Sequence, residues 1–324
     1  SPWPIETFDR SKMLVRSLDV LDLPLLSRYR RDLLSLDSAR ILTRGNPLSA
    51  VALLAYLDPR HQIYTAVAND DGLSLMGQVT LHEEETSARA TFLAPAENIN
   101  GLSQPLLDHL VTQAGEWGAF HLLAEVDEDS PAFRLLRQSG FAMYAWQRVW
   151  KLPLAGQDNT KKDIWRPAAE TDWPAVQSLY GQIVPALLHP VEVLPKQVIG
   201  LVCRPEGNLQ AYVAVNSGPK GIWIQPIVPP DSDCVSEQLA GLAYALTGGR
   251  ERPIYVCVRS YQAWLESILS DLGAQAGPRQ AVMVRRLAKL QKVEEKISAM
   301  DKVLVKPTAP VARVVTNQDI PPKE

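Results

Sequence analysis

The chain has 324 residues, 46% hydrophobic and 21% charged, a composition typical of folded globular proteins and unlike that of disordered chains. Its formal net charge of -3 gives no electrostatic basis for nucleic-acid binding. The three cysteines lack CxxC spacing, and no apolar stretch is long enough to span a bilayer. We therefore expect a cytoplasmic protein with no disulfide scaffold, no metal site and no membrane partner.

The chain repeats one order of predicted elements, and its length favours two domains. Residues 15–24 and 165–174 both read as a short strand containing an Arg, followed by an Asp and a Pro at a helix start. Residues 62–72 and 210–218 both read as a strand that enters a hairpin turn, because Asp-Gly and Ser-Gly supply a residue with positive φ.

Each copy is predicted to close with a strand, a helix that ends at a glycine, and a final strand. The predicted segments are strands at 120–126 and 253–259, helices at 130–141 and 261–273, and final strands at 142–151 and 281–287. These patterns predict one domain at residues 13–152 and a second at 164–288, with a polar linker at 153–163.

Residues 289–324 differ in character from both copies. An apolar stripe at helical spacing predicts an amphipathic helix, and the residues from Pro307 onward read as a disordered tail. The stripe consists of Leu290, Val293, Ile297, Met300 and Leu304. The helix could dock onto the second domain, or it could mediate self-association or contact a partner.

Residues 93–107, LAPAENINGLSQPLL, read as a strand that ends at a proline, a turn of small and polar residues, and the start of a helix. Such a junction directs free backbone N–H groups and the positive end of the helix towards one point, where an anion can bind.

This stretch resembles the acetyl-CoA-binding signature of the GNAT acyltransferase superfamily. In that signature a strand ending in Val-x-Pro is followed by Gln/Arg-x-x-Gly-x-Gly/Ala and a helix with a Leu pair. By spacing, Pro95, Gly101 and the pair Leu106 and Leu107 match, whereas Asn98 replaces Gln/Arg and Ser103 replaces Gly/Ala. The resemblance covers residues 13–152 and, less closely, residues 163–288.

The resemblance implies an α/β (α+β) protein with two tandem GNAT-like domains, each a mixed, mostly antiparallel sheet flanked by helices. It implies acetyl-CoA as co-substrate, with no metal. The expected binding residues are Leu93, Pro95, Asn98, Ile99, Asn100, Gly101, Leu102 and Ser103. The alternative is that this strand, turn and helix were inherited without a ligand role.

The general base is expected in the run Glu83, Glu84 and Glu85, because like-charge repulsion raises the pKa of adjacent carboxyls. Spacing within the family favours Glu84. The alternative is a solvated hairpin tip. In many relatives a Tyr directly after the Leu of the penultimate helix is the general acid that protonates the departing CoA thiolate. Here Leu136 follows Leu135, and Tyr144 is the candidate substitute, provided that folding brings it to the cleft.

The second copy is expected to bind no CoA, because Asp231, Asp233 and Glu237 place negative charge where a pyrophosphate would lie. Cys234 and Cys257 are expected to be small core residues. Residues 32–57 are expected to form helices on the acceptor side. The favoured function is acyl-CoA-dependent transfer of an acetyl group to a small-molecule or peptide amine, and the alternative is a catalytically inactive binding or scaffolding protein.

Overall fold

The computed structural model describes residues 14–49, 61–70, 72–153, 164–194, 199–232, 234–247 and 252–287. Most of the predicted linker, the predicted C-terminal helix and tail, and residues 50–57 of the predicted acceptor-side helices lie outside these residues. None of the described helices is both long and apolar enough to cross a bilayer.

The first half contains elements at these bounds: β1 (Leu14–Ser17), η1 (Val20–Asp22), α1 (Leu23–Tyr29), β2 (Leu34–Ser35), α2 (Ser38–Arg44), β3 (His61–Asp70), β4 (Leu73–His82), β5 (Ser87–Ala94), η3 (Ala96–Asn98), α4 (Ile99–Glu116), β6 (His121–Asp127), α5 (Pro131–Gln138) and β7 (Ala142–Lys151). The hairpin, the strand before Pro95 and the helix after it were all predicted from the sequence and are confirmed.

The second half contains elements at these bounds: β8 (Trp165–Pro167), η5 (Glu170–Asp172), α6 (Trp173–Ile183), η6 (Ala186–Leu188), β9 (Gly200–Cys203), η7 (Pro205–Gly207), β10 (Ala211–Ser217), β11 (Ile222–Ile227), α7 (Val235–Thr247), β12 (Ile254–Arg259), η8 (Ser260–Gln262), α8 (Leu265–Asp271) and β13 (Gln275–Arg286). Strands β8 to β13 follow the order of β1 and β3 to β7, so the predicted two-copy fold is confirmed, although β2 and α2 of the first half have no counterpart among the described residues of the second. The predicted equivalence of residues 62–72 with 210–218 is wrong by one strand, because β9 is the counterpart of β3 and β10 is that of β4.

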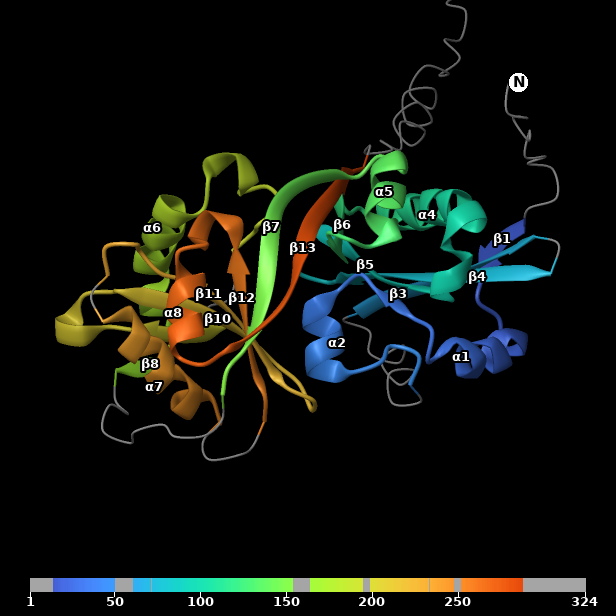
Figure 1. The fold of residues 1–324 in the computed structure, drawn as a ribbon. Helices are drawn as coiled ribbons and strands as arrows, with labels where there is room; N and C mark the ends of the chain where they lie inside the picture. The colour runs from blue at the N-terminus through green and yellow to red at the C-terminus, as the bar shows by residue number, and fades with distance from the viewer. Residues whose placement is uncertain are drawn as a thin grey trace, which may run out of the picture. The chain divides into compact units, whose positions relative to one another are not determined.

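One continuous sheet joins the two halves, and their last strands are exchanged. The strand order is β1-β3-β4-β5-β6-β13-β7-β12-β11-β10-β9-β8, with β2 added beside β5. Strand β13 of the second half pairs antiparallel with β6, and β7 of the first half pairs antiparallel with β12. Figure 1 shows β7 and β13 side by side between the other strands of the two halves. Each half therefore completes its share of the sheet with a strand from the other.

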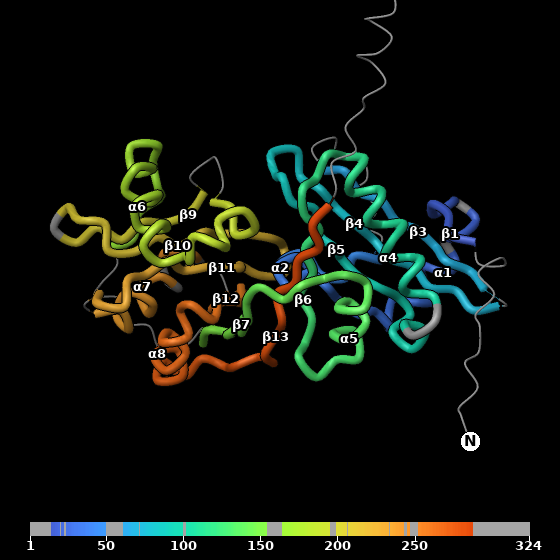
Figure 2. The backbone as a smooth tube through the Cα atoms, turned by 90° about the horizontal axis from the view of Figure 1, so that it is seen from above, coloured from blue at the N-terminus to red at the C-terminus, as the bar shows by residue number. Residues whose placement is uncertain are grey.

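The hydrophobic cores follow the same exchange. Ala281 and Met283 of β13 belong to the core of the first half, and Trp150 of β7 belongs to that of the second. Helix α4 lies against β3 and β4 (Figure 2). Gly77 of β4 permits this approach, because a Cβ there would lie 2.9 Å from Leu110 Cδ1 of α4.

Two equivalent ion pairs confirm the predicted repeat between residues 15–24 and 165–174. Arg16 Nη1 lies 2.6 Å from Asp22 Oδ2, and Arg166 Nη1 lies 2.8 Å from Asp172 Oδ2. In both copies the aspartate also accepts a hydrogen bond from the backbone N–H three residues earlier. The arginine hydrogen bond lowers the pKa of each buried aspartate, so both carboxylates stay ionised at neutral pH.

A line of four side chains crosses the middle of the sheet, and we call it the amide ladder. Gln280 Nε2 donates to Asp127 Oδ1 at 2.9 Å, Gln147 Nε2 donates to Gln280 Oε1 at 2.8 Å, and Arg259 donates to Gln147 Oε1. These residues are successive partners in the register of β6, β13, β7 and β12. Both amide dipoles therefore point from the arginine towards the aspartate, the favourable direction.

We predict that Gln147→Leu lowers the free energy of unfolding by about 1–3 kcal/mol, because it removes the acceptor of the buried Arg259 guanidinium and a donor to Gln280 Oε1. Urea denaturation measures the change. Gln275→Leu, at an exposed position of β13, is the control and should stay within about 0.5 kcal/mol of the parent protein. Equal stability of the parent and Gln147→Leu would show that the ladder does not hold the halves together.

Candidate functional site at the diverging strands

The junction predicted to bind an anion has the expected local structure. Strand β5 ends at Ala94, Pro95 follows, and the 3-10 helix η3 leads directly into α4. Asn100 and Gly101 lie in the first turn of α4. The N–H groups of that turn have no partner within the helix itself, as at any helix start.

Several side chains of the expected binding set are committed to the protein interior. Leu93, Ile99 and Leu102 are buried in the first core. The Ser103 hydroxyl is fully buried and donates to the Ile99 carbonyl. Asn98 donates from Nδ2 to the Ser74 carbonyl at 3.1 Å. These side chains fix the start of the helix, which leaves ligand contact at this junction to backbone groups.

Strands β5 and β6 run parallel at first and then diverge. They pair only over residues 87–89 and 121–123, and the ends of the strands beyond these residues form what we call the first fork. Against β4, Phe92 pairs with Gln78 and Ala90 with Val79, so Thr91 is an extra, bulged residue. A bulge bends its strand, which accounts for the separation of β5 from β6.

The segment that connects α1 to α2 lies in the first fork. Leu34 and Ser35 pair with Leu93 and Phe92 as strand β2. The next residue, Leu36, donates its N–H to the Thr91 carbonyl at 2.9 Å and accepts from Glu125 N–H at 2.8 Å. Leu36 therefore bridges both strands of the fork, and only 1% of it is exposed.

The prediction of helices throughout residues 32–57 is wrong at residues 34–36. The run Leu33-Leu34-Ser35-Leu36 is apolar enough for either a helix or a strand, and the local pattern does not decide between them. The free backbone groups at the edges of the first fork favour the strand, because buried N–H and C=O groups must be paired.

Two buried carboxylates adjoin this segment. Asp37 caps α2 by accepting from Arg40 N–H at 3.0 Å, and Glu125 Oε2 accepts from Ser38 N–H at 3.0 Å. Burial raises the pKa of Asp37, while the nearby positive charge of Arg89 opposes the shift. The sequence signal for Glu125 is the one acidic residue in the mostly apolar strand predicted at 120–126, and Glu125 was not among the residues expected at the site.

The three glutamates proposed as bases lie elsewhere. Glu83, Glu84 and Glu85 are exposed in the turn between β4 and β5, and Glu85 lies 3.9 Å from Arg89 in an ion pair. At about 3.3 Å per residue, the length of β5 places them roughly 25 Å from the Pro95 junction. The structure therefore does not bring this run and the junction together.

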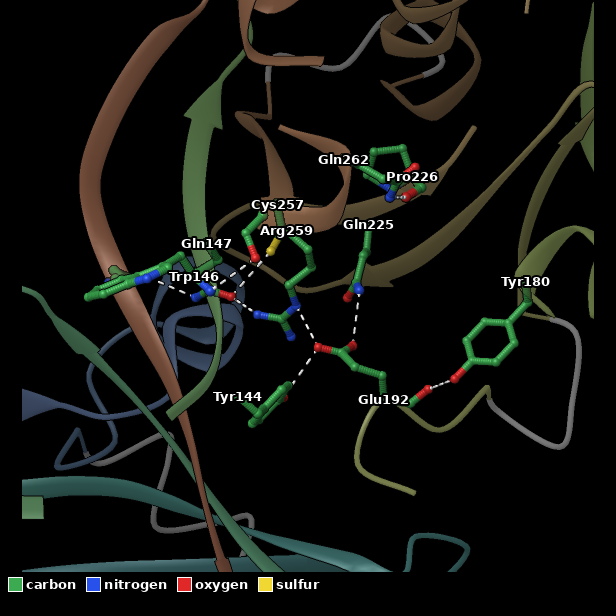
Figure 3. A network of polar contacts seen from close by, with 12 residues as sticks. Tyr144, Trp146, Gln147, Tyr180, Glu192, Gln225, Pro226, Cys257, Arg259 and Gln262 are labelled. Atoms are coloured by element: carbon green, nitrogen blue, oxygen red, sulfur yellow. Dashed lines mark hydrogen bonds and ion pairs between the residues drawn. The ribbon is translucent and has the colours of Figure 1, made fainter. Parts of the chain in front are cut away.

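Tyr144 contacts the second half. Its hydroxyl donates to Glu192 Oε1 at 3.2 Å, and the same carboxylate pairs with Arg259 Nε at 2.8 Å and accepts from Gln225 Nε2 at 3.3 Å. Figure 3 shows these side chains converging on Glu192. Burial raises the pKa of Tyr144 far above its ordinary value.

The second half contains an equivalent fork between β11 and β12, closed by one side chain. These strands pair in parallel only over residues 222–224 and 254–256. The amide of Gln262 accepts from Val228 N–H at 3.0 Å and donates to the Pro226 carbonyl at 2.8 Å (Figure 3). In this second fork, a side-chain amide pairs with the backbone groups of β11, as a backbone segment does with β5 in the first.

The cysteines divide into buried and exposed thiols. Cys203 and Cys257 are buried, and burial raises the pKa of Cys203 to about 11 and that of Cys257 to about 12. Cys257 is a core residue, as predicted. Cys234 is exposed at a positive φ of 57° just before α7, so the prediction of a core role for Cys234 is wrong. Among the described residues, no group of His, Cys, Asp and Glu could hold a metal ion.

Comparison with known proteins gives matches among solved structures. No family model and no curated protein sequence matches the chain. A GCN5-related N-acetyltransferase from Sphaerobacter thermophilus is 15% identical, with a TM-score of 0.52 over 85% of this chain and 96% of that one. A tandem GNAT protein from the clavulanic acid biosynthesis pathway is 14% identical, with a TM-score of 0.51 over 85% and 98%. At such identities these likenesses establish the fold.

We predict that a thiol-reactive disulfide reagent at pH 8 modifies one of the three cysteines rapidly in the native protein and all three after denaturation. Thiolates are the reactive form, and both buried thiols have raised pKa values. Cys234→Ser should remove the rapid phase. Rapid modification of Cys257 in that variant would contradict its burial.

Proposed function

We propose that the first half of this protein, which has the GNAT fold in two copies, binds an acyl-CoA and transfers its acyl group to an amine. The observation that carries the proposal is the first fork, beside the start of α4. Its two strands, β5 and β6, pair with the extended backbone of residues 34–36. An acyl-CoA requires this combination, because its pantetheine arm is an extended chain with amide groups and its pyrophosphate is an anion.

The chemistry of the first fork suits such a ligand. The Thr91 carbonyl can accept from an amide N–H, and Glu125 N–H already donates to a carbonyl oxygen, the group that a thioester would present. The Thr91 hydroxyl is buried and has no hydrogen-bond partner among the described residues. In this proposal the pyrophosphate lies at Pro95, Asn100 and Gly101, where backbone N–H groups of the first turn of α4 bind it.

The proposed acceptor is a small-molecule or peptide amine, and the proposed compartment is the cytoplasm, in keeping with three free cysteines. An amine must lose a proton to attack a thioester, so a carboxylate near the fork can act as base. Glu84 is the candidate from the sequence. Glu125 is the candidate from the structure, because its backbone forms one edge of the first fork.

A second candidate function is a catalytically inactive GNAT-fold protein that binds or scaffolds a partner. One observation favours it: the backbone groups that an acyl-CoA would need are already paired within the protein. Residues 34–36 occupy the first fork, and Gln262 occupies the second.

We predict that acetyl-CoA binds with micromolar affinity, about -8 kcal/mol, at one site per chain, as measured by calorimetry. Gly101→Glu should abolish binding, because a carboxylate in the first turn of α4 repels a pyrophosphate. Ser236→Glu, at an exposed position in the first turn of α7, is the matched control and should bind like the parent. The second candidate function would be favoured if acetyl-CoA produced no heat of binding with the parent protein or with the variants Leu36→Ala and Ser38→Pro.

We predict that Glu125→Gln lowers turnover with an amine acceptor by about 10²–10⁴-fold and leaves acetyl-CoA affinity nearly unchanged. Glutamine keeps an oxygen that can accept from Ser38 N–H, so the fold should be retained. Glu84→Gln is the matched comparison. Loss of turnover in Glu84→Gln alone would assign the base to the β4–β5 turn.

A further inference from the structure

We propose that residues 32–38 form an internal strap that occupies the acyl-CoA site of the first half and must withdraw before the ligand binds. This inference rests on the proposed function. It assigns to the strap a regulatory role, in which strap release sets the apparent affinity for acyl-CoA.

The strap contacts each part of the proposed site in turn. At its start, the Asp32 carbonyl accepts from Ala96 N–H at 3.3 Å, in the junction proposed for the pyrophosphate. Leu34 and Ser35 then pair along β5, and Leu36 bridges to Glu125. A ligand that lies along the junction and the fork would compete with the strap over its whole length.

The hydrogen-bonding pattern of the strap resembles that of the ligand. Leu36 presents one N–H to the Thr91 carbonyl and one C=O to Glu125 N–H. A pantetheine arm presents the same two groups, so exchange of one for the other leaves the buried backbone groups of the fork paired. Displacement therefore avoids the unpaired buried groups that would otherwise oppose it.

The strap is fastened at its far end to both halves. Ser38 N–H donates to Glu125, and the Ser38 hydroxyl donates to Gln280 Oε1 at 3.0 Å, which joins the strap to the amide ladder. The Leu36 side chain is buried in the first core. These contacts favour the closed state of the fork in the free protein.

Among the residues that the structure describes in the second half, no segment occupies the second fork as the strap occupies the first. Its occupant, Gln262, follows three residues after the end of β12, and the residue is only 1% exposed. A side chain anchored so near the fork cannot withdraw without rearrangement of η8. The asymmetry between the forks identifies the first as the one that can open.

The test measures acetyl-CoA affinity in two variants that weaken the strap. If the strap closes most molecules, the apparent dissociation constant equals the intrinsic one divided by the open fraction. Leu36→Ala should therefore bind acetyl-CoA about tenfold or more tightly than the parent protein. Leu136→Ala, which truncates a buried leucine of the same core on α5, is the matched control and should show no gain.

Ser38→Pro is the second variant, in case Leu36→Ala does not fold. Ser38 is the first residue of α2, where proline is well accepted, and Asp37 before it is already extended. The change removes both Ser38 contacts with Glu125 and Gln280. Ser38→Pro should also tighten acetyl-CoA binding. A separate measurement uses the parent protein: hydrogen exchange of the Leu36 amide should become faster when the protein is saturated with acetyl-CoA.

The outcomes separate the two proposals. Binding by the parent protein with no gain in either variant, and with a Leu36 amide that stays protected, would overturn the strap and leave the acyl-CoA site intact. Failure of the parent protein and both folded variants to bind would overturn the proposed function. Binding by the variants but not by the parent would support both.

Discussion

The amide ladder is the interaction on which the rest of the structure depends. It connects β6, β13, β7 and β12, the four strands at which the two halves meet, and its ends are Asp127 and Arg259. A register slip of one residue in β7 or β13 would turn its glutamine to the opposite face of the sheet and leave buried partners unpaired. The ladder therefore fixes the strand exchange, and with it the positions of both forks, since each end residue lies at the end of a fork strand.

The two forks show one physical constraint with two solutions. Parallel strands that diverge leave backbone N–H and C=O groups that must find partners. In the first fork the partner is Leu36, which lies 89 positions before Glu125 in the chain. In the second it is Gln262, three residues after the end of β12. A distant segment can leave without unfolding the fork strands, whereas a neighbouring side chain is part of the local fold.

Local features of the sequence predicted local structure well. The final strand of the first copy was predicted at residues 142–151 and is found there, and the strand before Pro95 and the helix after it were also predicted correctly. Turn residues and apolar periodicity encode such elements within a few positions. The strand exchange was not predicted, because β7 has the same pattern whether it pairs with its own half or with the other. Glu125 was not singled out, because its partner Ser38 lies 87 positions away.

Because the last strands are exchanged, side chains on the last strand of each copy contact residues of the other copy. Strand β7 carries Tyr144 to Glu192, beside Gln225 of the second fork, and β13 carries Gln280 to Ser38, beside the first fork. Each fork is thus completed by the last strand of the opposite half. The first fork therefore depends on the second half for the hydrogen bond between Ser38 and Gln280 that fastens its strap.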